Sequence, residues 1–321
     1  MKVGVTGASG FVGLHVTQAL CDAGHDVRAL VRRVPESDMA GVNDIRLIPT
    51  LGAETDRTAL SAALDGLDVI VHLAARVHIM RGGDEAAFID TNVGGSIALI
   101  EAAASAGVPR FIFMSSVKAV GERSGATPLN ASSTPTPEDA YGRSKLAAER
   151  ALLEIAHAQD IQLAILRPTF VYGWPAVGNL DTVIRALSNG IPLPLAGIDN
   201  RRDMIYVGNL ADAVAAAINA KKLTDTCYFL CDGDAVSTPA FFRRIGAAFA
   251  KPARLFYLPV WILRALGLLS GKSGMIDRLT ESLEVDSNPF RRDAGWQPAY
   301  NMDQGLAALA ANYRTHIQDE G

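Results

Sequence analysis

Short apolar runs alternate with segments of helical periodicity along the first half of the chain. The apolar runs lie at Lys2–Thr6, His25–Val31, Asp68–Ala74, Arg110–Ser116 and Ile161–Pro168, with a weaker run at Ile45–Ile48. Helical patterns fall between them at Gly10–Ala23, around Leu60–Leu64, at Glu85–Ala106 and from Tyr141 onward. Buried strands joined by helices are typical of a parallel sheet that is covered on both faces. Because such crossovers are right-handed, the pattern predicts an α/β fold with a doubly wound parallel sheet.

The regular alternation ends beyond Phe170. Short apolar strands at Asp203–Val207 and Cys227–Cys231 then mix with helical patterns at Asn209–Ala220 and Thr238–Ala250. This change predicts a second, smaller C-terminal lobe of α+β type. We expect the sheet domain to span residues 1–169 and the lobe to span 170–321. One strand and one helix near residues 203–220 are expected to return to the sheet domain.

Composition narrows the class of protein. A chain of 321 residues can form one large domain with a dependent lobe, and 49% hydrophobic residues fit a well-buried globular protein. The formal net charge of −4 argues against a nucleic-acid-binding protein, which usually carries a basic face. The three cysteines form neither a metal-binding pair nor a disulfide framework, so we expect no metal site and a reducing cytoplasm.

No segment of the sequence predicts a membrane span. The N-terminus is already strand-like and has no long apolar stretch before a cleavage site. The most apolar later stretch, Leu255–Gly271, is interrupted by Pro259 and Arg264 and is too short to cross a bilayer. We expect a core or interface helix there, with a helix lying on a membrane surface as the alternative.

Three glycines follow the first predicted strand in the stretch TGASGFVG. Gly7, Gly10 and Gly13 allow a tight turn, a close approach of the backbone to a pyrophosphate, and close packing of helix on strand. The helix N-terminus that follows would face the phosphates. A plain strand–helix turn is the alternative, but the position at the start of an alternating pattern favours a dinucleotide-binding Rossmann domain. The expected cofactor contacts on this turn are Gly7, Ser9, Gly10, Phe11, Val12 and Gly13.

The end of the second predicted strand distinguishes the two nicotinamide cofactors. NAD-binding proteins of this fold carry an acidic residue there for the ribose hydroxyls. This chain has Val31, followed at once by Arg32 and Arg33, which can bind the 2′-phosphate of NADP. Solvated loop cations are the alternative. The missing carboxylate favours NADP as the cofactor, with NAD possible.

Tyr141 and Lys145 lie four residues apart at the start of a predicted helix, so they share one face. A free tyrosine has a pKa near 10, and a neighbouring ammonium group lowers the pKa by stabilising the phenolate. This spacing also occurs by chance on helix surfaces. Together with the glycine turn and the Ser115–Ser116 pair at the end of the fifth strand, it indicates an acid–base site.

These pieces occur in one ordered set that resembles the extended short-chain dehydrogenase/reductase family, in its nucleotide-sugar epimerase, dehydratase and reductase branch. The set covers nearly the whole chain. Its motifs are TGASGFVG, VIVHLAA (69–75), TNVGGS (91–96), FMSSVKAVG, YGRSK, LRPTFVYG (166–173) and RRDMIYVGNLADA (201–213).

The resemblance implies roles for particular residues. Ser116 rather than Ser115 would orient the reacting sugar oxygen, Tyr141 would exchange its proton, and Lys145 would also bind the nicotinamide ribose. Asn92 would help to hold this region together. The resemblance places further cofactor contacts at Leu73, Ala74, Ala75, Asn92, Tyr141, Lys145 and Pro168.

Substrate contacts follow from the same resemblance. The diphosphate of a UDP-sugar needs cations or loop amides despite the acidic net charge, and Arg202 stands where relatives contact it. Asn179 and Arg278 are further candidates, and Ser116 would touch the sugar. For each of them a solvated charge or a turn is the alternative. A homodimer through the Glu85–Ala106 and Tyr141 helices is the expected assembly.

Departures from the family pattern reduce the number of reactions that this chain is expected to catalyse. Sugar dehydratases of the family carry an Asp–Glu pair after the serine, whereas this chain has Val117 and Lys118. The remaining prediction is an NAD(P)-dependent oxidoreductase that acts at C4 of a UDP-hexose. A reductase of UDP-4-keto-6-deoxy-(N-acetyl)hexosamine in surface-polysaccharide biosynthesis is favoured. A UDP-hexose 4-epimerase with tightly held NAD is the alternative, and a non-catalytic dinucleotide-sensing regulator is more remote.

Overall fold

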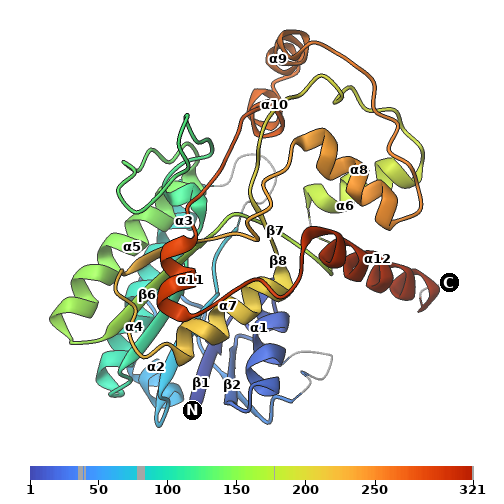
Figure 1. Cartoon of the computed structure of the whole chain (residues 1–321). Helices are drawn as coiled ribbons and strands as arrows, with labels where there is room; N and C mark the ends of the chain where they lie inside the picture. Colours follow the sequence, from blue (N-terminus) through green and yellow to red (C-terminus); the bar gives the residue numbers. More distant parts are fainter. Residues whose placement is uncertain (35–38, 40, 78–83, 177, 320–321) are drawn as a thin grey trace.

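A parallel sheet of seven strands forms the centre of the protein (Figure 1). The computed structural model describes residues 1–34, 39, 41–77, 84–176 and 178–319. The strand order is β3-β2-β1-β4-β5-β6-β9, and every neighbouring pair is parallel. This confirms the predicted fold class. The strands are β1 Lys2–Thr6, β2 Asp26–Val31, β3 Asp44–Leu47, β4 Val69–His72, β5 Arg110–Met114, β6 Gln162–Pro168 and β9 Cys227–Leu230.

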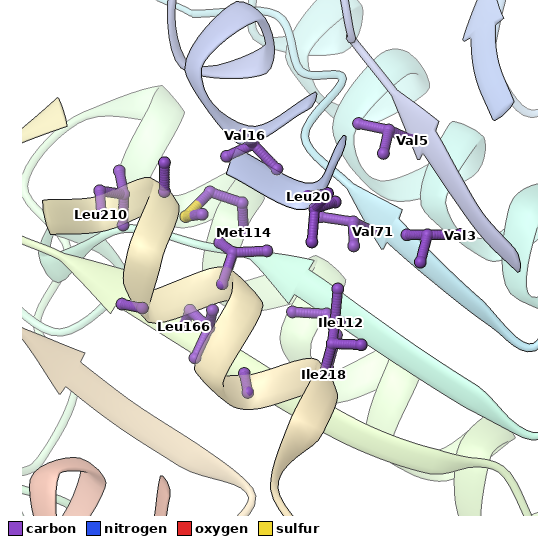
Figure 2. Packing of buried hydrophobic residues seen from close by; sticks show 14 of the residues in the cluster. Val3, Val5, Val16, Leu20, Val71, Ile112, Met114, Leu166, Leu210 and Ile218 are labelled. Atoms are coloured by element: carbon purple, nitrogen blue, oxygen red, sulfur yellow. The ribbon is translucent and has the colours of Figure 1, made fainter. Parts of the chain in front are cut away.

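Helices cover both faces of this sheet. On one face lie α1 (Phe11–Asp22) and α7 (Val207–Asn219), and apolar side chains of β1, β4, β5 and β6 pack against them, as Figure 2 shows. On the other face lie α2 (Arg57–Leu64), α4 (Gly95–Ser105) and α5 (Ala140–Ala158). From Val3 onward in β1, and throughout β4, the residues are buried because apolar layers meet them from both sides.

The long helix expected at Glu85–Ala106 is present with an irregular turn inside it. It begins as α3 (Glu85–Phe88), widens into a π-helical stretch at Ile89–Gly94, and continues as α4. Short π-helical turns inside α-helices often occur at functional positions. Asn92 lies within this stretch and is buried.

The C-terminal lobe has a small sheet and its own apolar core. Strand β7 (Phe170–Tyr172) pairs with β8 (Met204–Tyr206), and buried side chains of the neighbouring helices surround this pair. The helices of the second half are α6 Asn179–Ser188, α8 Thr238–Ala248, α9 Val260–Leu269, α10 Ser273–Thr280, α11 Asn288–Ala294 and α12 Met302–Asp319.

Helix α7 returns to the sheet domain, where it packs on α1. The expected returning strand is a correction: among the described strands β8 pairs with β7 and lies outside the large sheet, and the strand that joins the large sheet is the later β9. Tyr228, Phe229 and Leu230 of β9 are buried beside β6. An apolar run shows that a segment forms a strand but not which edge it pairs with, because the hydrogen-bonding groups are the same in every strand. The exact boundary at residues 169 and 170 remains a prediction.

In the part of the chain that the structure describes, none of the helices combines the length and apolar character needed to cross a membrane.

The turn between β1 and α1 is built by glycines in close contact. Gly7 has a φ of +69°, and the Gly10 N–H donates to the Gly7 carbonyl at 3.0 Å. A Cβ atom added to Gly13 would lie 2.0 Å from the Gly7 oxygen. A left-handed φ and this lack of space each require glycine.

We therefore predict that Gly13→Ala lowers the free energy of unfolding by about 1–3 kcal/mol, because backbone rather than a flexible side chain must move. Urea unfolding measures this change. Gly125→Ala is the matched control: among the described atoms none lies within 4 Å of its added Cβ. A Gly13→Ala protein as stable as the control would contradict this account of the turn.

Candidate active site

The predicted cofactor residues converge at one edge of the sheet. Gly7 follows β1, Leu73–Ala75 follow β4, Ser116 follows β5, and Pro168 ends β6. These four strands are parallel neighbours, so their carboxyl ends meet at the same edge. The turns also touch, because a Cβ added to Gly7 would lie 2.7 Å from the Ala74 nitrogen. Ligands of open parallel sheets bind at this edge.

The geometry of the first turn suits a bound dinucleotide phosphate. Among the described residues, no side chain caps the N-terminus of α1, and its first turn holds no acidic residue. The N–H groups of Phe11 and Val12, and the turn residues Ser9 and Gly10 before them, therefore lie at an uncapped helix N-terminus, which favours an anion. The space that a side chain at Gly13 would fill is taken by the turn backbone. Arg32 and Arg33 follow β2 and are exposed.

Ser116, Tyr141 and Lys145 come together from two elements beside this turn. Ser116 caps the short helix η2 (Val117–Ala119), and the other two lie on the first turns of α5. Ser116 lies close enough to Tyr141 to lower the pKa of its phenol, and the Lys145 Nζ lies 6.0 Å from the centroid of the Tyr141 ring. The structure thus assembles the three residues that the sequence proposed as catalytic.

Lys145 carries its ammonium group into the protein interior. The residue is 2% exposed, its Nζ donates to the Met114 carbonyl at 2.8 Å, and the Nζ lies 4.6 Å from the centroid of the Phe113 ring. Burial lowers the pKa of Lys145 to about 7, while the Glu149 carboxylate acts in the opposite direction. Lysine therefore titrates near neutrality at this position.

Burial also raises the pKa of Tyr141, and the negative charge of Asp139 raises it further, while the Ser116 hydroxyl acts in the opposite direction. The net effect is opposite to the lowered pKa that the spacing of Tyr141 and Lys145 predicted. Asp139 caps α5 by accepting from the Gly142 N–H at 2.7 Å. Lys118 Nζ donates to Asp139 at 2.7 Å and to Glu122 at 3.0 Å. Lys118 therefore neutralises part of the acidic charge beside the tyrosine.

Ser115 has a different partner from Ser116. Its hydroxyl donates to the Glu149 carboxylate at 2.5 Å, and the Arg167 guanidinium binds both oxygens of the same carboxylate at 2.6 and 2.9 Å. All three side chains are buried. The Ser115 hydroxyl therefore serves this ion pair, and the catalytic role that the resemblance gives to Ser116 stays a prediction.

Sequence reasoning missed the ion pair between Glu149 and Arg167. The signal was present: Arg167 stands in the otherwise apolar strand run IQLAILRP, and a charge inside a buried strand requires a buried partner. Glu149 follows Lys145 by four residues, so the same helix face that carries the lysine also carries the carboxylate.

Asn92 contacts the backbone at the end of β4. Its Oδ1 accepts from the Arg76 N–H at 2.7 Å and its Nδ2 donates to the Arg76 carbonyl at 3.0 Å. The same Nδ2 donates to the Ser144 hydroxyl at 2.9 Å. Asn92 thus ties the loop that follows Leu73–Ala75 to helix α5. Its direct contact with a cofactor stays a prediction.

His72 is a buried member of the strand core. Its ring nitrogens bond the hydroxyls of Thr6 at 2.7 Å and Ser96 at 2.9 Å. Burial, followed by the charge of Lys145, lowers the pKa of His72 to about 3. His72 is therefore neutral at physiological pH.

Two of the four predicted substrate residues, Arg202 and Arg278, lie near each other in the lobe. Burial lowers the pKa of Arg202, and the neighbouring charge of Arg278 adds to this effect. A cavity of about 190 Å³ lies beside Arg278 and Asp139. Asn179 begins α6, and its side chain lies outside what the structure describes. Its substrate role stays a prediction.

The described residues contain no group of three His, Cys, Asp or Glu side chains that could hold a metal ion.

Comparison with known protein sequences identifies the family of this chain. The model of the NAD dependent epimerase/dehydratase family matches residues 3–227. A protein of Vibrio cholerae named UDP-glucose 4-epimerase is 33% identical and is aligned over 97% of this chain and 96% of its own length.

Two solved structures show the same fold at lower identity. The UDP-glucose 4-epimerase of Thermotoga maritima with UDP-glucose has a TM-score of 0.79 and 22% identity, covering 99% of this chain and all of that one. The UDP-glucuronic acid 4-epimerase of Bacillus cereus in complex with NAD has a TM-score of 0.78 and 21% identity, covering 98% and 99%. With the family match over residues 3–227 and the close relative over nearly the full length, the chain belongs to the NAD-dependent epimerase/dehydratase family, in the extended short-chain dehydrogenase/reductase branch.

Proposed function

We propose that this enzyme is an oxidoreductase that acts at C4 of a UDP-hexose, most simply as a reductase of a UDP-4-keto-6-deoxy-(N-acetyl)hexosamine. The observation that carries the proposal is the assembly of Ser116, Tyr141 and Lys145 beside the glycine turn. A regulator that only senses a dinucleotide would not need these three side chains. The Vibrio cholerae relative named UDP-glucose 4-epimerase supports a nucleotide-sugar substrate.

A nicotinamide cofactor, when bound, supplies the hydride for a C4 carbonyl. Tyr141 has a raised pKa, so its phenol is protonated at neutral pH and can donate a proton to the carbonyl oxygen. Ser116 holds that oxygen near the phenol. Lys145 stabilises the phenolate that remains, because its ammonium group lies on the same helix face.

Arg202 and Arg278 are proposed to bind the substrate diphosphate. The two guanidinium groups are near each other and near the Glu122 carboxylate, which lies 3.8 Å from Arg278, and guanidinium groups are well suited to bind a diphosphate. Binding energy from the diphosphate would then position the sugar at Tyr141. Asn179, at the start of α6, is a third proposed contact.

Lys118 supports a reaction other than dehydration. Sugar dehydratases that this chain resembles carry an Asp–Glu pair after the serine. Here Lys118 lies in that position and binds Asp139 and Glu122. A cation held by two carboxylates does not abstract a proton from the sugar carbon.

The alternative function is UDP-hexose 4-epimerisation with NAD held throughout the cycle. The name of the Vibrio cholerae relative favours it. Arg32 and Arg33 at the end of β2 favour NADP and thus the reductase. The same site serves both reactions, so the cofactor decides between them.

The proposed assembly is a homodimer through the helices of α3–α4 and α5. These helices pack on one another, and Ile89 and Leu153 are exposed on them. Analytical ultracentrifugation measures the assembly, and a monomer at micromolar concentration would argue against it.

We predict that Tyr141→Phe lowers kcat by at least about 100-fold, because the proton donor is lost while the ring remains. Cofactor affinity, measured by fluorescence titration, should change little. Tyr257→Phe, at an exposed tyrosine, is the matched control and should retain full activity. Turnover by Tyr141→Phe at the control rate would sink the proposed mechanism.

Burial of Lys145 predicts a pH dependence of stability. The pKa is about 7 in the folded protein and about 10.4 in the unfolded chain, so between these values the unfolded state binds more protons. In nucleotide-free protein, the free energy of unfolding relative to Lys145→Met should rise with pH above about 7. The slope should reach up to about 1.4 kcal/mol per pH unit. Urea unfolding from pH 6 to 10 measures it, and a difference that stays flat would contradict the buried charge.

The nucleotide released from freshly purified, denatured protein distinguishes the two reactions. NADP, or an empty site that accepts NADPH, is expected for the reductase, and stoichiometric NAD would indicate the epimerase.

Replacing both Arg32 and Arg33 by Ser should reduce the preference for NADPH over NADH at least about tenfold, because charge-assisted hydrogen bonds are lost. Arg243→Ser on the exposed side of α8 is the control.

A further inference from the structure

An apolar face on helix α9 is left open to solvent. The side chains of Trp261, Leu268 and Leu269 are 72%, 73% and 86% exposed. Phe256 and Tyr257, just before the helix, are also exposed. Monomeric proteins rarely expose large apolar side chains in such a cluster, and a cluster of this kind marks an interaction site.

The helix is apolar on nearly all sides, although only one side is covered. Leu263 and Gly267 lie one turn apart on the buried side, where a Cβ at Gly267 would meet Ile276 of α10. Trp261 and Leu268 are seven residues apart, so they share the opposite side, with Leu269 next to them. A helix that is hydrophobic all round is normally buried, so the open side of α9 is suited to an apolar partner.

The segment that contains this helix is rich in cations, although Asp277 follows it on α10. The segment from Lys251 to Ile276 contains four cations and no carboxylate, in a chain whose net charge is −4. Arg264 pairs with Glu281 at 2.5 Å. Among the residues that the structure describes, no ion pair engages the other three cations, Lys251, Arg254 and Lys272, and all of them are exposed.

We propose that α9 and the segment before it dock on a membrane surface that carries anionic lipids. An interfacial helix places apolar side chains, often with Trp, at the level of the headgroups, and its cations bind the anionic lipids. Here α9 supplies the apolar side chains, and Lys251, Arg254 and Lys272, before and after the helix, supply the cations that have no ion pair among the described residues. A second copy of the chain fits less well, because a two-fold contact would bring two sets of cations together.

The position of α9 in the fold permits this contact. Helices α9 and α10 pack on each other and form the outer end of the C-terminal lobe, away from the large sheet (Figure 1). A flat bilayer can therefore approach this end while the sheet domain stays in water.

The test is flotation of the full-length protein with lipid vesicles. Vesicles of phosphatidylglycerol and phosphatidylcholine in equal parts should bind it at least about tenfold more than phosphatidylcholine alone. The triple variant W261S/L268S/L269S should lower binding to the mixed vesicles at least about tenfold, because apolar contact is lost. The control Leu47→Ser removes an exposed leucine on β3 and should bind as the natural protein does.

A second variant separates charge from folding. R254Q/K272Q leaves the apolar side chains in place and should lower binding to the mixed vesicles about tenfold or more, since each cation near such a surface contributes about fivefold. Circular dichroism establishes that each variant is folded. Absence of binding by the natural protein, or unchanged binding by both variants, would overturn the proposal. A dimer that the triple variant converts to monomer, without vesicle binding, would identify a second copy as the partner.

Discussion

Burial of the Lys145 ammonium group is the constraint on which the rest of the site depends. A lysine in an apolar interior is costly unless its charge is shared with polar atoms. The Met114 carbonyl at the end of β5 and the Phe113 ring supply this contact, and both are available only because β5 lies in the middle of a sheet covered on both faces. The same burial that lowers the pKa of Lys145 raises that of Tyr141. The apolar core around Tyr141 and Lys145 therefore shifts the pKa values of both side chains.

Buried polar contacts hold the elements around that pair at fixed positions. The carboxylate of Glu149 is satisfied by Arg167 and by the Ser115 hydroxyl, so helix α5 is joined to both β5 and β6. Asn92 joins the same helix to the end of β4. Because an unpaired group at any of these positions would be penalised, the network restricts the arrangement of the elements. This restriction places Ser116 beside the tyrosine.

The sheet domain and the outer end of the lobe differ in how far their large apolar side chains are covered. In the sheet domain, the apolar side chains of the central strands are covered, and the buried charges of Glu149 and Arg167 are paired. On α9, at the outer end of the lobe, large apolar side chains are exposed, and the segment 251–276 contains four cations and no carboxylate. Local departures of this kind from the usual burial of apolar residues are expected at functional surfaces. The lobe thus carries both the proposed substrate arginines and the exposed apolar face of α9.

The sequence by itself determined the strands and helices of the first half, the glycine turn, and the Tyr141–Lys145 spacing, because these depend on local periodicity and on residues near one another in the chain. It also predicted that the open stretch around α9 would be a helix. Only the tertiary structure decided that β9 rather than β8 completes the sheet, that Ser115 serves Glu149 while Ser116 faces Tyr141, and that the outer face of α9 is uncovered. The physical reason is that partners such as Glu149 and Arg167, eighteen residues apart, or β6 and β9, more than fifty apart, are chosen by packing in space. The periodicity of apolar residues along the chain does not show which distant residues or strands will pair.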